Sequence, residues 1–282
     1  MIIKTYGILV LIVFIVSSCS APKEKTVEAI AEKPIVKQSP KEMLSEAYQL
    51  FKEGKDAESI EIAKQVLAIG RETKNDTLIG KSLSSMCRNA QRDLDTTRLA
   101  ELSAQLAELS ASSGDQQWMM YRAHMNAEMW RLIGNMDRAE AYYDESMRIS
   151  SEIGSIGMFT IDHFNKSFVS VAKGDFETAN ALIKRYYELR NEADPKSEDA
   201  YGLIALAYLL EQQGNYNGAH EVAVVTRRLF KEQNLFPEPP DEKPLIAVEV
   251  KVKEELDATE WQELSDNSDG ETVTSLLAKY LE

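Results

Sequence analysis

The chain has 282 residues, of which 44% are hydrophobic and 28% are charged, a balance typical of a globular protein with a sizeable core. Acidic residues outnumber basic ones by 46 to 32, and the net charge of -14 disfavours a nucleic-acid partner because phosphates are repelled. The histidines His124, His163 and His220 lie far apart and form no metal-ligand spacing, so no metal or other cofactor is expected.

Residues 1–18 are predicted to be an export signal. Lys4 precedes an apolar run at residues 8–16, which is too short to span a membrane and ends two small residues before Cys19. This pattern resembles the bacterial lipobox, which implies cleavage before Cys19 and lipidation of its sulfur. A plain secretory peptide with an incidental cysteine is the alternative. We expect an exported chain that is lipid-anchored to a bacterial membrane, and Ser20 favours the outer one because it is not the aspartate of inner-membrane retention.

A linker precedes the first helix. Residues 19–39 are rich in Lys, Glu, Ala and Pro without a sustained apolar period, which predicts a solvated spacer. Ser39, Pro40 and Glu42 then form a capping-box pattern. The first helix of the folded body should therefore begin at Pro40.

The body contains an internal repeat with a period of 40 residues. A glycine column predicts a turn between two helices, because glycine tolerates a positive φ at a helix end. Small residues seven positions before and five positions after each turn predict close contact of the helix backbones. The turn column contains Gly54, Gly134, Gly174 and Gly214, with Leu94 in the register that lacks glycine. The small columns contain Ala47, Cys87, Ala127, Ser167 and Ala207, and Ser59, Leu99, Ala139, Ala179 and Ala219.

These columns resemble the tetratricopeptide repeat (TPR), a helix-turn-helix unit. The third unit carries the pattern best, with Ala127, Trp130, Gly134, Ala139 and Tyr143. The resemblance implies an all-α, right-handed superhelical solenoid. Its five repeats are expected over residues 40–235, at about 40–79, 80–119, 120–159, 160–199 and 200–235. The period exceeds the usual length of about 34 residues, which resembles the longer repeats of kinesin light chains and MalT-type regulators.

Residues 236–282 are predicted to form an acidic segment with a capping helix. The prolines within residues 237–240 should end the last repeat helix. Residues 245–253 fit either a strand or a helix, and we favour a helix because a lone strand has no partner in this architecture. The apolar stripe within residues 273–281 predicts a final helix that covers the exposed end of the solenoid.

In TPR proteins the first helix of each pair lines a concave face, and the resemblance assigns partner contacts to fixed positions of these helices. Arginine and tyrosine there suit a segment with acidic and apolar side chains. We therefore expect a protein or peptide partner in the cell envelope to bind at Arg88, Tyr121, His124, Glu128, Arg131, Phe164, Phe168, Tyr201 and Tyr208. The alternative is that the aromatic residues pack between neighbouring helices.

No sequence pattern predicts an enzyme. His124 and Glu128 have the spacing of an acid–base pair on one helix face, but a solvated pair or a ligand contact is favoured because no nucleophile accompanies them. Cys87 is expected to be a packing residue. Residues 266–271 resemble a calcium loop, but the ligand spacing does not fit, so we expect a turn. The sequence favours a membrane-anchored TPR scaffold or assembly factor, with a ligand-sensing regulatory domain as the alternative.

Overall fold

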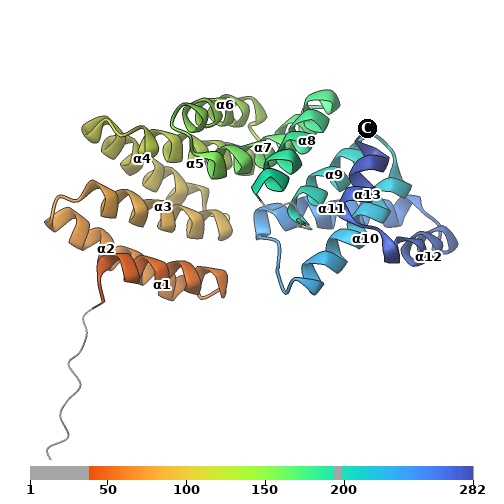
Figure 1. Cartoon of the computed structure of the whole chain (residues 1–282), viewed down its shortest axis with the longest axis horizontal. Helices are drawn as coiled ribbons and strands as arrows, with labels where there is room; N and C mark the ends of the chain where they lie inside the picture. The colour runs from red at the N-terminus through yellow and green to blue at the C-terminus, as the bar shows by residue number, and fades with distance from the viewer. Residues whose placement is uncertain (1–37, 194–198, 282) are drawn as a thin grey trace, which may run out of the picture. The chain divides into compact units, whose positions relative to one another are not determined.

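The computed structural model describes residues 38–193 and 199–281, and these residues form thirteen α-helices and no strand (Figure 1). The predicted signal peptide, Cys19 and almost all of the linker lie outside the described residues. Within the described ranges, each helix is too short or too polar for a membrane crossing.

Ten of the described helices form five consecutive helix-turn-helix pairs. The pairs are α1 (Pro40–Lys52) with α2 (Asp56–Glu72), α3 (Asp76–Arg92) with α4 (Thr96–Ser113), α5 (Gln116–Ile133) with α6 (Met136–Glu152), α7 (Ile156–Ala172) with α8 (Phe176–Ala193), and α9 (Tyr201–Gln212) with α10 (Tyr216–Glu232). Through α8, each helix packs on the next, and α9 packs on both α7 and α8. The expected all-α solenoid of five helix pairs is confirmed.

The first helix begins where the sequence predicts. Pro40 is its first residue, the Ser39 side chain accepts a hydrogen bond from the Glu42 backbone, and the Glu42 carboxylate accepts one from the Ser39 N–H at 2.7 Å. This reciprocal capping box satisfies N–H groups that would otherwise lack partners at the start of a helix.

The turns between helices use the left-handed backbone region. The predicted turn glycines Gly54, Gly134, Gly174 and Gly214 have φ values of 72°, 86°, 76° and 78°. Leu94 takes the same conformation with a φ of 56°, although a non-glycine residue there costs about 1–2 kcal/mol. Leu94 therefore replaces the missing glycine in the predicted register.

The two small columns bring the helix backbones together. All ten of their residues have 0% exposure, from Ala47 and Ser59 in the first pair to Ala207 and Ala219 in the fifth. Cys87 belongs to this set, and burial raises the pKa of its thiol to about 12. The side chain is therefore a protonated packing residue, as the sequence analysis expected.

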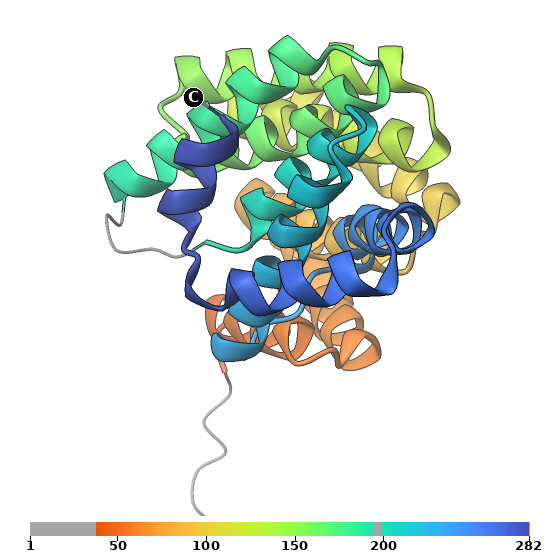
Figure 2. The same cartoon turned by 90° about the vertical axis from the view of Figure 1, so that its right-hand side faces the viewer.

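Three further helices follow the repeats: α11 (Pro239–Glu255), α12 (Ala258–Asn267) and α13 (Val273–Tyr280), with the 3-10 turn η1 (Ser268–Gly270) between the last two. The helix favoured over a strand at residues 245–253 is confirmed as part of α11. Figure 2 shows the C-terminal helices in blue against the last helix pair in cyan. α11 packs on α9 and α10, and it also contacts α3, far away in the sequence. α13 caps α10, where Lys279 and Tyr280 bond to Glu221.

Candidate functional site

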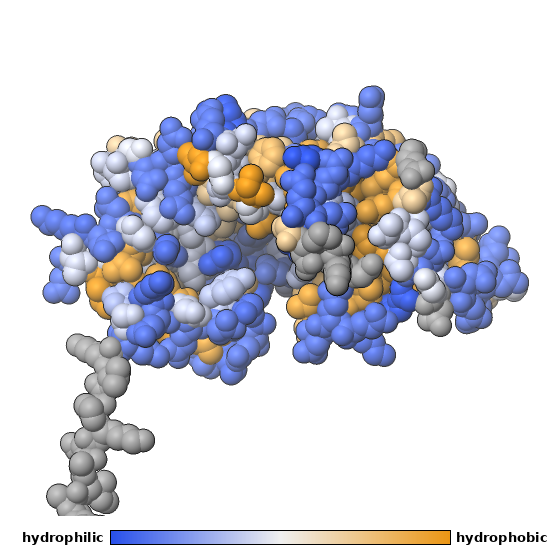
Figure 3. Space-filling model, in the orientation of Figure 1, coloured by the Kyte–Doolittle hydropathy of each residue, from blue (hydrophilic) through white to orange (hydrophobic). Residues whose placement is uncertain are grey.

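The first helices of the pairs surround a concave groove. One cavity of about 830 Å³ is lined by residues of α1, α3, α5, α7, α8 and α9 and by the segment that leads into α11. A second cavity of about 440 Å³ lies between α1, α3 and α5. Ser84, Arg88 and Tyr121 line both cavities, so the two form one continuous groove. Figure 3 shows the hollow between the first helix pairs and the C-terminal helices.

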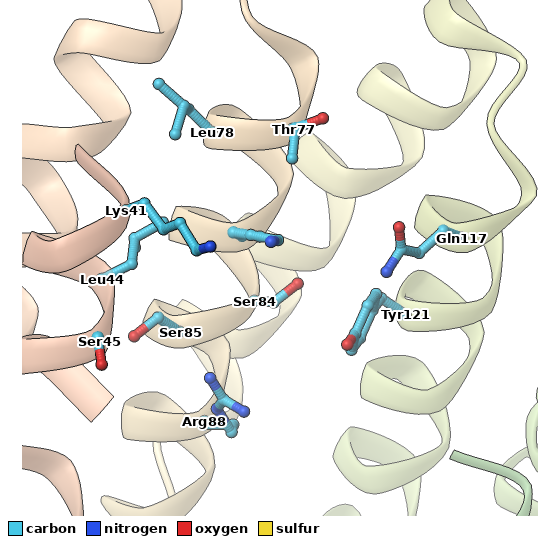
Figure 4. Close-up of a pocket in the computed structure, with 11 residues that line it drawn as sticks. Lys41, Leu44, Ser45, Thr77, Leu78, Ser84, Ser85, Arg88, Gln117 and Tyr121 are labelled. Carbon is cyan, nitrogen blue, oxygen red and sulfur yellow. The ribbon is translucent and has the colours of Figure 1, made fainter. Parts of the chain in front are cut away.

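The N-terminal end of this groove is cationic. Lys41, Lys81 and Arg88 line the smaller cavity, and no acidic residue lines it. Across the described ranges, none of these three side chains forms an ion pair, although Arg88 lies 5.2 Å from the centre of the Tyr48 ring. In Figure 4, Ser84 and Tyr121 face each other across the gap between α3 and α5. A local positive charge in a chain of net charge -14 would attract an acidic group.

The middle of the groove contains a buried polar network centred on Glu128. This carboxylate has 0% exposure and accepts hydrogen bonds from Gln91 Nε2 at 2.6 Å, from Arg131 Nη2 at 2.7 Å and from the Tyr143 hydroxyl. Burial favours the neutral acid, but Arg131 and His124 outweigh it and hold the pKa of Glu128 below its usual value. Glu128 is therefore an ionised structural group at neutral pH.

His124 belongs to the same buried region. Its Nδ1 lies 2.7 Å from Asp162 Oδ1 of α7, and both side chains are buried. Burial opposes the charged imidazolium, but Asp162 prevails and raises the pKa of His124 above its usual value. Of the two expectations for His124 and Glu128, the solvated pair is wrong, because each is buried with a partner from another helix, and the ligand contact stays a prediction.

The segment that leads into α11 also lies in the groove, and the sequence analysis did not anticipate this. We call residues 235–241 the strap, which comprises the segment 235–238 and the first three residues of α11. Within it, Glu238 Oε1 lies 3.5 Å from Arg92 Nη2 and Asp241 Oδ1 lies 3.4 Å from Arg131 Nη2. The Tyr201 hydroxyl donates a hydrogen bond to the strap backbone at the Phe236 carbonyl, at 3.2 Å. Charge complementarity between the acidic strap and the groove arginines was the available signal.

The residues expected to bind a partner fall into two sets. Arg88, Tyr121 and Tyr201 are partly exposed and line the larger cavity, and His124 and Phe164 reach it from buried positions. In contrast, Glu128, Arg131 and Phe168 are buried, and the partly buried Tyr208 packs on the Phe168 ring. A partner reaches Arg131 only if the strap moves, since Asp241 is bonded to it. Partner binding by the first set stays a prediction.

Two groove residues of α1 were missed. Lys41 and Tyr48 line the groove and occupy the same positions in the first repeat as Lys81 and Arg88 in the second. The 40-residue register would have identified them if it had been extended back by one unit.

Neither models of known protein families nor curated proteins match this sequence. Among solved structures, BtubC (BKLC) from P. vanneervenii aligns with 86% of this chain and 92% of that chain, with a TM-score of 0.50 and 17% identity. The TPR-like repeats of a putative kinesin light chain from Podosopora anserina align with 77% of this chain and 99% of that chain, with a TM-score of 0.48 and 15% identity.

The helix pairs and the similarity to BtubC define the class of this protein by its fold. It is an all-α protein of TPR-like repeats. The resemblance drawn from the glycine and small-residue columns is therefore confirmed for the fold.

Proposed function

We propose that this protein is a binding scaffold that holds a segment of a partner protein in its concave groove. The observation that carries the proposal is the cationic end, where Lys41, Lys81 and Arg88 line the smaller cavity and no acidic residue lines it. Ile156 and Ile161, both exposed, line the same groove further along. The groove thus combines exposed apolar side chains with cationic side chains that form no ion pair in the described residues. Such a surface suits a peptide that carries apolar and acidic side chains.

A second candidate is a site for a small ligand, as in a sensor domain. The larger cavity has a volume of about 830 Å³, within the range of roughly 300–1,000 Å³ that is usual for small-molecule sites. Its tyrosines, among them Tyr48, Tyr121 and Tyr186, offer both ring faces and hydroxyl groups. We favour the peptide because the groove continues into the smaller cavity and is open along that direction. In both readings we propose that the groove binds a ligand without catalysing a reaction.

Crosslinking capture tests the scaffold function. The full-length protein and a Lys81→Glu, Arg88→Glu variant would be crosslinked in membranes of the producing cell, and captured proteins identified by mass spectrometry. We expect the variant to capture at least about tenfold less partner. A loss of about 1.4 kcal/mol in binding free energy is enough to lower the affinity tenfold. The matched control reverses two exposed lysines on second helices, Lys64→Glu and Lys184→Glu, and should keep the partner. Equal capture by both variants would refute binding in the groove.

We also propose that the protein is exported and anchored to a bacterial membrane by lipid on Cys19. Ser20 favours the outer membrane over the inner one. The apolar run and the two small residues before Cys19 support the lipid attachment. Acyl chains contribute about 0.8 kcal/mol for each buried methylene, which suffices for a stable anchor. Changing Cys19→Ala should move the protein from the membrane fraction to the soluble fraction. A variant that still sediments with membranes after a carbonate wash would exclude the lipid anchor.

A further inference from the structure

The strap occupies part of the groove in which we propose that a partner binds. Glu238 and Asp241 lie three residues apart, and each faces an arginine on a different first helix, Arg92 on α3 and Arg131 on α5. The strap therefore bridges two neighbouring repeats from inside the groove. Its contact with Arg131 joins residues 110 positions apart in the sequence.

Each of these arginines already has a nearer acidic partner. Arg131 lies 2.7 Å from Glu128, compared with 3.4 Å from Asp241. Arg92 lies 2.8 Å from Asp56, compared with 3.5 Å from the strap. If the strap leaves, neither arginine becomes a buried charge without a partner, which is the situation that makes a broken ion pair costly. The strap can therefore leave the two arginines, and return to them, without leaving a buried charge unpaired.

The strap is packed unevenly. Phe236 is 79% exposed and Leu235 is also exposed, so its two largest apolar side chains are not inserted into the core. Pro237 and Pro240 are buried, but only residues 235–238 precede α11, because Pro239 and Pro240 are its first two residues and Asp241 lies in its first turn. Burial raises the pKa of both Glu238 and Asp241, and Glu128 adds to the rise, whereas Arg92 and Arg131 oppose it.

We infer that the strap is an internal ligand of the groove, and that the partner carries the same chemistry. The partner would carry two carboxylates three residues apart, spaced as Glu238 and Asp241 are at the start of α11, and it would compete with the strap for Arg92 and Arg131. This inference rests on the proposed scaffold function. It adds that the free groove is partly occupied by its own chain, so that affinity for the partner is reduced by the fraction of molecules with the strap in place.

A peptide copied from the chain tests this inference. A fluorescent peptide of residues 233–243 would be titrated with the full-length protein in detergent, and binding followed by anisotropy. In a Glu238→Gln, Asp241→Asn variant the strap loses both carboxylates, so we expect the peptide to bind at least about tenfold more tightly than to the unchanged protein. A peptide with the same two amide changes should bind to neither protein.

The matched control is a Glu254→Gln, Glu263→Gln variant, which removes two exposed carboxylates from α11 and α12. It should bind the peptide as weakly as the unchanged protein does. Equal affinity of the strap variant and this control, with helix content unchanged by circular dichroism, would overturn the inference. Equal binding of the acidic and amide peptides would overturn it as well. Partner capture that depends on Lys81 and Arg88 would survive either result, so failure here is distinguishable from failure of the scaffold function.

Discussion

The two ends of the groove differ, although the same repeat builds both. At the N-terminal end, Lys41, Lys81 and Arg88 face an open hollow without acidic partners in its lining. Further along, the positions equivalent to Arg88 hold Glu128 and Phe168, which are buried among groups of the same chain. The repeat therefore determines the direction of a side chain. The residue type at each position determines whether that side chain finds a bonding or packing partner within the same chain.

The difference does not come from the scaffold. The small columns have 0% exposure in every helix pair, and the turn residues adopt positive φ at both ends. What differs is the strap, whose Glu238 and Asp241 form ion pairs with Arg92 and Arg131, whereas Arg88 forms no ion pair in the described residues and acts on Glu238 only through its charge. The N-terminal end, with Lys41, Lys81 and Arg88, is thus the part of the groove that the strap does not occupy.

Removing the centre of the buried network should give the largest effect. Glu128→Ala leaves Arg131 buried with only the longer contact to Asp241, and it leaves the Tyr143 hydroxyl without its acceptor. Loss of one partner of a buried pair costs about 3–5 kcal/mol. Chemical denaturation should report that loss in the free energy of unfolding. Arg88→Ala, at the equivalent position of the open end, should stay within about 0.5 kcal/mol. Similar losses for both variants would contradict the distinction between the two ends.

The shared scaffold should respond alike in different helix pairs. Ala139→Leu and Ala179→Leu add volume at fully buried helix contacts, so each should lower the free energy of unfolding by about 1–3 kcal/mol. Ala111→Leu is the control, because Ala111 is exposed in the last turn of α4, and it should cost little. Thermal or urea unfolding measures all three. A cost at Ala111 as large as at the other sites would argue against the 40-residue register.

A smaller effect is expected from pH on the docking of the strap. Burial raises the pKa of Asp241 from 3.8 to about 7; Arg131 opposes the rise, while Glu128 and Glu238 add to it. Tyr201, which also faces Asp241, stays neutral because burial raises its pKa above its usual value. A raised pKa means that the docked strap binds the proton more strongly than the free strap. The stabilisation of docking by that proton is therefore fully present below about pH 4 and is lost as the pH rises through about 7.

Hydrogen exchange measures this dependence at the strap amides, after correction for intrinsic rates. Protection of residues 235–241 should be lower at about pH 8.5 than at about pH 5.5. The neutral variant Asp241→Asn should remove most of the difference. Protection that rises with pH in the unchanged protein would show that the ion pair with Arg131 dominates over burial.

The sequence by itself determined the repeat architecture. Gly134 at a turn and Ala127 and Ala139 at the helix contact are local requirements, since a positive φ and a close approach of two backbones restrict the residue at its own position. Such requirements recur in every unit, so they can be recognised in the sequence from their period of 40 residues. Even Leu94, which breaks the glycine column, could be placed correctly from its register.

Only the tertiary structure decided which groove positions are open. Arg131 and Phe168 share their position classes with Arg88 and other groove residues, yet they are buried. Their environment depends on contacts across the superhelix, such as that between Arg131 and Asp241, 110 residues apart. A periodic pattern specifies the direction of a side chain within its own repeat. It does not specify what a distant segment brings against that side chain, because this depends on how the successive helix pairs curve to close the groove.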